Sequence, residues 1–374
     1  MLFYLLLQLM EKASWLSWLN VFRYPSTRII AATLTALVIS FLLSPWFIRR
    51  LQQQQIGQPI REDGPESHFV KAGTPTMGGS LILFSLVLST VLWCDLANGF
   101  IWMLLTITVG YGVVGFVDDT LKIRKRSSAG ISGKLKFGLQ TVIAVGALYY
   151  IFQSDIMGPF KLDVALPFAN FYEITLALPI WLYVIVGAVV VVGASNAVNL
   201  TDGLDGLAIV PVIINAFVFL LIAYLVGSNL QTADGRTIAQ YLGVPHIPDV
   251  TEAAIFCGAM AGAGVGFLWY NTYPAQVFMG DVGSLSLGGG LGALAIMTKS
   301  EFVLLVTGGI FVMEAVSVIL QVAYFKTTGK RIFLMAPIHH HFEKKGWPEP
   351  KVIVRFWVIS FMLALIGLGM LKAR

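Results

Sequence analysis

The chain has 374 residues, of which 57% are hydrophobic and 12% are charged, with a net charge of +5 and a mean hydropathy of +0.79. Soluble domains are about 45–50% apolar and about 25% charged, so this composition excludes a soluble globular protein. Membrane helices would use most of the length, and we therefore predict an all-α polytopic membrane protein with a single domain over 1–374.

The N-terminal segment 1–26 begins apolar but has neither a basic start nor a small-residue cleavage site. We therefore do not interpret it as a cleaved signal peptide. Trp15, Trp18, Phe22 and Tyr24 are aromatic residues of the kind that gather where a membrane meets water. We expect a short interfacial helix in this segment.

About ten apolar runs follow the N-terminal segment, and each is a candidate transmembrane helix. Several are shorter than the ~20 residues that a span usually needs. The runs lie near 27–48, 78–94, 99–117, 137–152, 174–194, 206–226, 252–270, 284–298, 302–325 and 353–371.

Lys and Arg gather in alternate loops and predict the orientation of the chain. The loops after the first, third and ninth runs are rich in them, whereas the intervening loops carry only Lys161, Arg236 and Lys299. By the positive-inside rule the odd-numbered loops face the cytoplasm, so ten spans place both termini outside. Lys372 and Arg374 oppose this orientation weakly.

Two shorter patterns have structural interpretations. The outer loop 153–173 alternates apolar and polar residues from Phe160 to Leu166 before Pro167, which is typical of a small hairpin. The glycine-rich run 288–292 lies inside a predicted span, so we interpret it as a site of close helix packing and not as a phosphate-binding loop.

Two adjacent carboxylates, Asp118 and Asp119, end the third apolar run, and Lys122 follows them. The C-terminal end of a helix carries the negative end of its dipole, so carboxylates there cost stability, and neighbouring carboxylates repel each other. Stability does not account for this pair, but a bound cation would. We predict that the pair begins a metal and phosphate site at the membrane surface.

Two further loops on the predicted cytoplasmic side are acidic and contain no Lys or Arg, 199–206 and 278–284. Acidic loops beside basic loops suit a divalent metal together with a multiply anionic substrate, because Mg²⁺ typically takes one or two carboxylates and substrate phosphates. Asp202 and Asp205 are three residues apart and would share a face at a helix start, which favours a joint role. The alternatives are an N-cap at Asp202 or the preceding threonine, and a turn at Asp281.

The loop after the ninth run contains three consecutive histidines, His339, His340 and His341. Zinc sites usually use spaced ligands, so we favour hydrogen bonds from these histidines to phosphate or sugar. A metal site and a solvated loop without a role remain as alternatives. In the loop after the first run, Pro and Gly indicate turns, and Thr76 can cap the second span.

The ninth run carries Glu314, Ser317 and Gln321 at helical spacing, which forms one polar stripe inside a predicted span. An acid within a span is a functional candidate by default. A structural seam of hydrogen bonds explains the stripe equally well.

At these positions the chain resembles the polyprenyl-phosphate N-acetylhexosamine-1-phosphate transferases, and within them the phospho-N-acetylmuramoyl-pentapeptide-transferases, from about residue 20 to the end. The three-histidine segment and the loop 63–79 favour that branch over its N-acetylglucosamine relatives. The matching pieces are Asp118-Asp119 with Lys122, the segment 196–206, Phe278-Met279-Gly280-Asp281, the segment 337–343 and the loop 63–79.

The resemblance implies a ten-helix enzyme of the bacterial inner membrane, a homodimer whose active site faces the cytoplasm. It implies transfer of phospho-N-acetylmuramoyl-pentapeptide from UDP-N-acetylmuramoyl-pentapeptide to undecaprenyl phosphate. The products are UMP and lipid I, and the reaction is the first membrane step of peptidoglycan synthesis. Mg²⁺ is the expected cofactor, and we expect no nucleic-acid partner.

The resemblance also implies roles for individual residues. Asp118, Asp119 and Asp281 are expected to be catalytic, with Asp281 binding Mg²⁺ and Asp118 and Asp119 as possible further metal ligands. Asp118 can also accept a proton from the lipid phosphate, and Phe278 can stack on uracil. The residues expected to contact substrate are Lys71, Thr76, Lys122, Lys136, Asn199, Asp202, Asp205, Phe278, His339, His340 and His341.

Three alternatives stay open at the level of sequence. The first is the same chemistry on UDP-N-acetylglucosamine. The second is a transporter that uses membrane acids as an ion path, although transport predicts acids near the bilayer midplane and here only Glu314 fits. The third is a covalent route through an aspartyl phosphate instead of direct transfer between phosphates.

Overall fold

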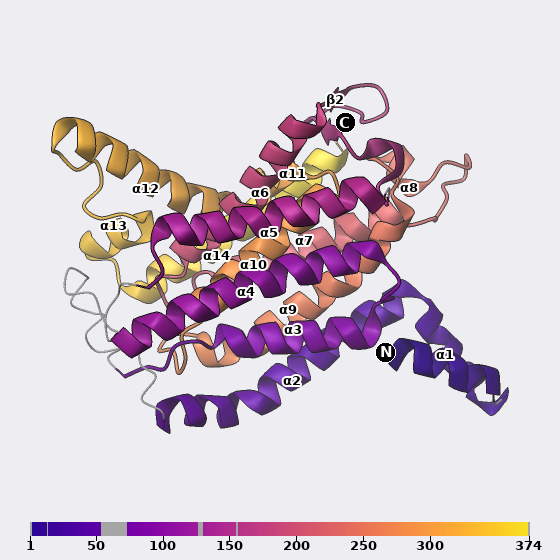
Figure 1. The fold of residues 1–374 in the computed structure, drawn as a ribbon, viewed down its shortest axis with the longest axis horizontal. Helices are drawn as coiled ribbons and strands as arrows, with labels where there is room; N and C mark the ends of the chain where they lie inside the picture. Colours follow the sequence, from indigo (N-terminus) through magenta and orange to yellow (C-terminus); the bar gives the residue numbers. More distant parts are fainter. Residues whose placement is uncertain (1, 13, 54–72, 126–129, 155, 373–374) are drawn as a thin grey trace.

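The computed structural model describes residues 2–12, 14–53, 73–125, 130–154 and 156–372. Long helices lie side by side along one axis in these residues, which confirms the all-α prediction (Figure 1). Within the described ranges, nine helices are long and apolar enough to cross a membrane. They are α2 (Pro25–Gln53), α4 (Gly99–Lys125), α5 (Gly133–Ser154), α6 (Ile180–Thr201), α7 (Ile209–Gly227), α9 (Thr251–Asn271), α10 (Gly280–Met297), α12 (Gly309–Thr328) and α14 (Glu349–Lys372).

Every predicted apolar run contains a helix, and the second and ninth runs differ most from single ordinary spans. The second forms α3 (Gly79–Trp93), an apolar helix of 15 residues. The ninth was predicted as one helix and is two, because α11 (Glu301–Thr307) is followed by its C-cap Gly308 and α12 starts at Gly309. Two adjacent glycines weaken a helix. Gly309 also lets α14 approach, since a Cβ there would lie 2.9 Å from Leu363 Cδ1.

Helix α10 is the central helix of the bundle, and each of its residues from Val282 to Met297 is buried. Its glycine run lies against two neighbouring helices, which confirms the packing interpretation. A Cβ at Gly288 would lie 2.7 Å from Ser195 Cα of α6, and one at Gly289 would lie 2.6 Å from the Tyr111 ring of α4. Small residues thus let α10 approach α4 and α6 closely.

The predicted hairpin is a two-stranded antiparallel sheet of β1 (Asp163–Ala165) and β2 (Thr175–Ala177). Its second strand lies in what was expected to be the start of the fifth span. The N-terminal segment forms two short helices in place of the one expected, α1 (Leu2–Lys12) and η1 (Ser14–Arg23). The remaining short helices are η3 (Gly158–Phe160), α8 (Ile238–Tyr241), η4 (Pro248–Val250) and α13 (Ile338–Lys344).

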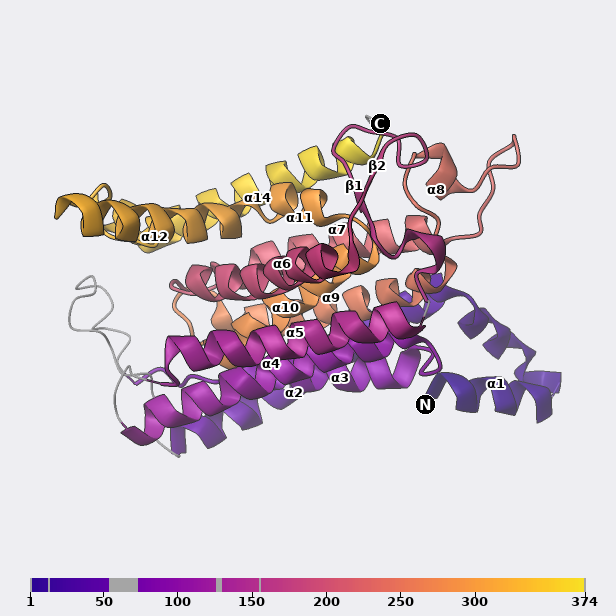
Figure 2. The ribbon, with the colours of Figure 1, turned by 45° about the horizontal axis from the view of Figure 1, so that its top comes forward.

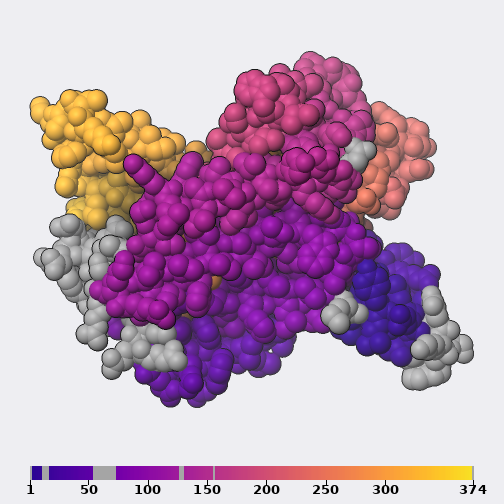
Figure 3. All heavy atoms as spheres, in the orientation of Figure 1, coloured from indigo at the N-terminus to yellow at the C-terminus, as the bar shows by residue number. Residues whose placement is uncertain are grey.

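The two ends of the bundle carry different features. The described ends of the chain lie at the same end as the small sheet and α8 (Figure 2). The C-terminal end of α4 and the helix α13 lie at the opposite end. In the space-filling view α1 and α12 stand out from the body on opposite sides (Figure 3). The acidic segments and the histidines therefore share one end of the molecule, away from both termini.

Candidate metal and phosphate site

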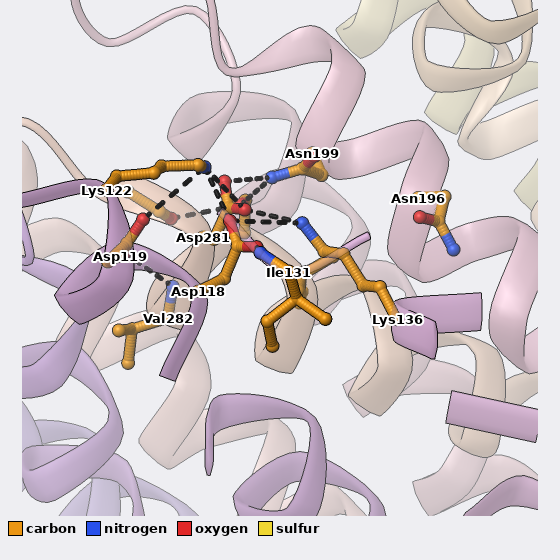
Figure 4. Close-up of polar contacts among 12 residues, drawn as sticks. Asp118, Asp119, Lys122, Ile131, Lys136, Asn196, Asn199, Asp281 and Val282 are labelled. Carbon is orange, nitrogen blue, oxygen red and sulfur yellow. Dashed lines mark hydrogen bonds and ion pairs between the residues drawn. The ribbon is translucent and has the colours of Figure 1, made fainter. Parts of the chain in front are cut away.

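Three carboxylates from two helices converge at this end of the bundle. Asp118 and Asp119 lie near the C-terminal end of α4, and Asp281 lies in the first turn of α10. One oxygen atom from each lies within 4.8 Å of the others, and all three residues are largely buried. The predicted meeting of these distant acids is confirmed (Figure 4).

Two lysines lie among the carboxylates. Lys122 Nζ is 2.6 Å from Asp118 Oδ2 and 2.9 Å from Asp281 Oδ2. Lys136 Nζ, from α5, is 2.5 Å from Asp281 Oδ2 and 3.7 Å from Asp118 Oδ2. Three carboxylates thus face two ammonium groups, which leaves one negative charge among these five side chains. The lysines are point charges that suit phosphate oxygens as well as carboxylates.

Fixed donors orient each carboxylate. Asn199 Nδ2, from α6, donates to Asp281 Oδ1 at 2.8 Å. The backbone N–H of Ile131 donates to Asp118 Oδ1 at 2.7 Å, and that of Val282 donates to Asp119 Oδ2 at 3.3 Å. Each acid therefore has a defined direction before any ligand arrives, as a preorganised site requires.

Asp202 lies beside this cluster at the C-terminal cap of α6. The N-cap alternative is wrong, because α7 begins only at Ile209 after an N-cap at Ala208. Burial, followed by the negative charges of Asp281 and Asp119, raises the pKa of Asp202 to about 8. Crowded acids of this kind favour either protonation or a bound cation.

Asp205 faces different partners from Asp202, so the expected shared helix face is wrong. Its Oδ2 accepts from the Ala275 N–H at 2.9 Å, and its own N–H donates to Glu349 Oε1 at 3.1 Å. The reason is local, because residues 202–208 form turns between α6 and α7 and Gly206 has a φ of +74°. Asp281 is helical, so its interpretation as a turn residue is also wrong.

The described part of the first loop runs beside the segment that leads into α10. The Phe278 N–H donates to the Pro75 carbonyl at 2.8 Å, and the Gly78 N–H donates to the Phe278 carbonyl at 2.9 Å. Thr76 is buried against Gly280, and it does not cap α3, whose N-cap is Gly78. Lys71 lies outside the described residues.

The three histidines have separate surroundings. His339 is fully buried, with Nδ1 3.1 Å from Glu314 Oε2, and its Nε2 occupies the space that a Cβ at Gly203 would need. His340 Nδ1 lies 2.7 Å from Glu343 Oε2, and His341 Nδ1 accepts from the Leu334 N–H at 3.1 Å. In the described part of the chain, the potential metal-binding group found is the acidic cluster, which does not include a histidine.

The polar stripe of α12 holds the segment that carries the histidines. Glu314 is fully buried against His339. Gln321 Oε1 accepts from the Ile332 and Phe333 N–H groups at 3.1 and 2.9 Å, and its Nε2 donates to the Phe333 carbonyl. These contacts favour the structural seam over an independent functional acid.

Sequence reasoning missed polar residues that connect the acidic segments. Asn271, the last residue of α9, accepts from the Gly206 N–H at 3.1 Å and donates to the Val277 carbonyl at 2.9 Å. It thereby joins the turn after α6 to the segment before α10. Gln140, inside α5, was also missed. The available signal was a side-chain amide within or at the end of an apolar run, which is unfavourable unless paired.

Comparisons with known proteins point in the same direction as this geometry. Residues 101–299 match the glycosyl transferase family 4 model, and residues 71–83 match the phospho-N-acetylmuramoyl-pentapeptide-transferase signature 1. The chain is 56% identical over 365 residues to the phospho-N-acetylmuramoyl-pentapeptide-transferase of Sorangium cellulosum, with 96% of each chain covered. It is 55% identical over 378 residues to that of Desulfatibacillum aliphaticivorans, with both chains fully covered.

Proposed function

Because the chain belongs to the phospho-N-acetylmuramoyl-pentapeptide-transferases, we infer that it transfers phospho-N-acetylmuramoyl-pentapeptide from UDP-N-acetylmuramoyl-pentapeptide to undecaprenyl phosphate. The products are lipid I and UMP, and the reaction begins the membrane stage of peptidoglycan synthesis. The observation that carries this function is the convergence of three carboxylates and two lysines at one end of a membrane bundle. It suits phosphate chemistry at headgroup depth better than an ion path across the membrane.

We propose that Asp281 binds Mg²⁺, with Asp118 and Asp119 as further ligands. The donor set fits this ion, because Mg²⁺ prefers hard oxygen ligands and shares its coordination between a few carboxylates and substrate phosphates. A bound Mg²⁺ would supply charge stabilisation for the departing UMP. The negative charge that remains among the five side chains, and the crowding felt by Asp202, support a cation at this position.

The lysines and Asp118 have roles in bringing two anions together. Phosphoryl transfer depends mainly on positioning and electrostatic stabilisation. Lys122 and Lys136 reach the carboxylates now and can pair with phosphate oxygens when substrate binds. Asp118 orients the lipid phosphate, and its role as a base is secondary, because a phosphate monoester has a second pKa of about 6 and is largely deprotonated at neutral pH.

The remaining predicted contacts serve the nucleotide, the sugar and the lipid. We assign Asn199, Asp202, Asp205 and Phe278 to the UDP portion, with Phe278 stacking on uracil. Thr76 and Lys71 are assigned to substrate binding as well. His340 and His341 are assigned to phosphate or sugar, whereas His339 is buried and acts by holding its segment against Gly203. The exposed apolar faces of the helices nearby would hold the prenyl chain, in a homodimer of the bacterial inner membrane.

The experiment is a UMP-release assay of detergent-purified protein with undecaprenyl phosphate and either UDP-N-acetylmuramoyl-pentapeptide or UDP-N-acetylglucosamine. We expect release only from the first nucleotide, loss of release in a chelator, and full recovery on adding Mg²⁺. Release from UDP-N-acetylglucosamine alone would support the sister activity. Unchanged turnover in chelator would remove the metal from the proposal and leave the transferase activity standing.

A further inference from the structure

A fully buried glutamine on α5 connects the helices that carry the site. Gln140 is 0% exposed inside a membrane-spanning helix. Its Oε1 accepts from Asn196 Nδ2 at 2.8 Å, and its Nε2 donates to Ser195 Oγ at 3.3 Å. Ser195 Oγ in turn donates to the Leu285 carbonyl of α10 at 2.9 Å. One chain of hydrogen bonds therefore crosses α5, α6 and α10.

The same three helices meet at the acidic cluster, one helical turn away. Lys136 of α5 and Asn199 of α6 both contact Asp281 of α10. Gln140, Ser195 and Leu285 are each four residues from these partners along their own helices, so they lie on the same faces about 6 Å deeper. Figure 4 shows Lys136 and Asn199 directed at Asp281, with Asn196 apart from the cluster.

The helix α4, which carries the other two acids, joins the inner layer as well. Tyr111 is fully buried and its hydroxyl donates to the Gln140 backbone carbonyl at 2.8 Å. Tyr111 lies seven residues, or about two turns, before Asp118. The charged layer around Asp281 and the neutral layer around Gln140 thus each contact α4, α5, α6 and α10, at successive depths in the bundle.

Stability alone does not account for the neutral layer. Hydrogen bonds between membrane helices contribute little stability on average. An amide left unpaired in an apolar interior destabilises the protein by more than such a bond contributes. An apolar side chain at position 140 would avoid the risk altogether. The amide also has a defined orientation. Its oxygen needs a donor and its nitrogen needs an acceptor, and both partners are in place in one register of α5 against α6.

We propose that Gln140 and Ser195 are positioning residues for the transfer reaction, which hold α5, α6 and α10 in the register that brings Lys136 and Asn199 onto Asp281. This inference rests on the proposed function of the cluster. Without the neutral layer, α5 can slide or rotate against α6, and Lys136 no longer reaches the carboxylate. A displacement of about 1 Å at a reacting group can cost about 100-fold in rate.

The test compares Gln140→Leu and Ser195→Ala with a matched control, Asn215→Leu. Asn215 is a fully buried amide on α7 whose Nδ2 donates to the Thr307 carbonyl of α11 at 3.2 Å. Neither α7 nor α11 contributes a residue to the cluster. All three variants remove a hydrogen bond between membrane helices, so a general loss of stability would affect them alike.

We expect Gln140→Leu and Ser195→Ala to lower kcat by about 10- to 100-fold, with KM for the nucleotide changed less than about threefold. Asn215→Leu should lower Tm by a similar amount and keep the wild-type kcat. A Gln140→Leu enzyme with wild-type kcat would overturn the proposal, as would equal losses of kcat in the control. Failure of wild-type protein to release UMP would instead reject the proposed function.

A double-mutant cycle tests whether Gln140 acts through Lys136. In a Lys136→Met background, Gln140→Leu should reduce kcat by less than about twofold, because the group that it positions is already absent. Independent, multiplicative losses would show that Gln140 does not act through Lys136 and would overturn the proposal. Tm of each variant in detergent reports folding separately from catalysis, so a variant that fails to fold is recognised and is replaced in the test by Ser195→Ala.

Discussion

Asp281 is the residue at which most contacts of the site meet. It accepts from Asn199, pairs with both lysines and starts the central helix α10. Its position in the first turn places a negative charge at the favourable end of a helix dipole, whereas Asp118 and Asp119 lie at the unfavourable end of α4. The helix dipoles therefore stabilise the negative charge of Asp281 and destabilise those of Asp118 and Asp119, although the three acids share one cluster.

The first prediction concerns Asp281→Asn. The substitution keeps the shape of the side chain and the acceptor for Asn199 but removes the charge that faces Lys122, Lys136 and the proposed cation. We expect kcat for UMP release to fall at least about 100-fold, with the protein still folded. Asp234→Asn is the control, because Asp234 is an exposed acid at the opposite end of the bundle. Within the described chain, its ion-pair partner is Arg236, which is not part of the cluster. Near-normal turnover of Asp281→Asn would contradict the assignment.

At the scale of elements, the site depends on how closely α4 and α10 approach. A Cβ at Gly115 would lie 2.3 Å from the backbone oxygen of Asp281 and 2.6 Å from the backbone nitrogen of Val282. Both neighbours are backbone atoms of the first turn of α10, so they cannot move away without displacing the turn. One glycine, three residues before Asp118, thus permits the two acidic helix ends to meet.

Gly115→Ala is therefore expected to move the start of α10 away from α4. We expect a loss of about 1–3 kcal/mol in stability, as for other overpacked contacts, together with a marked loss of kcat. Gly146→Ala on α5 is the matched control, because a Cβ there meets nothing within 4 Å. Thermal unfolding in detergent and UMP release measure both effects. Equal Tm and equal kcat in the two variants would show that the close approach of α4 and α10 does not matter for function.

At the scale of the whole molecule, the bundle has a site end and a terminal end. The C-terminal end of α4, with its acids, and the histidine helix α13 lie at one end (Figure 1), and both described chain ends lie at the other (Figure 2). The distribution of Lys and Arg predicts that the site end faces the cytoplasm, where nucleotide substrates are made. The sidedness is a prediction of the charge distribution along the sequence.

Cysteine labelling tests the sidedness directly. Both native cysteines, Cys94 and Cys257, are buried, so wild-type protein should give no signal with a membrane-impermeant maleimide. Asp234→Cys, in an exposed loop at the terminal end, should label in intact spheroplasts. Lys330→Cys, in the exposed turn after α12, should label only after lysis. The reverse pattern would invert the predicted orientation and would place the site on the wrong side for its substrate.

The sequence by itself determined that this is a membrane bundle and where most of its helices lie, and it predicted an acidic site with lysines at the membrane surface. Hydropathy and charge are properties of single residues transferred between water and lipid, so they can be read from each segment alone. The likeness to a known family added the reaction and the assignment of Asp281. The glycine run of α10 was also readable, since small residues in a span indicate close packing.

The tertiary structure alone decided the break of the ninth run at Gly308, the turns that separate Asp202 from Asp205, and the buried partner of Glu314. It also decided that Lys122 and Asn199 reach the same carboxylate, although they lie 159 and 82 residues from Asp281 in the chain. These features depend on the register between helices that are distant in sequence. That register is set by glycine contacts and side-chain hydrogen bonds between helices, which no single segment contains.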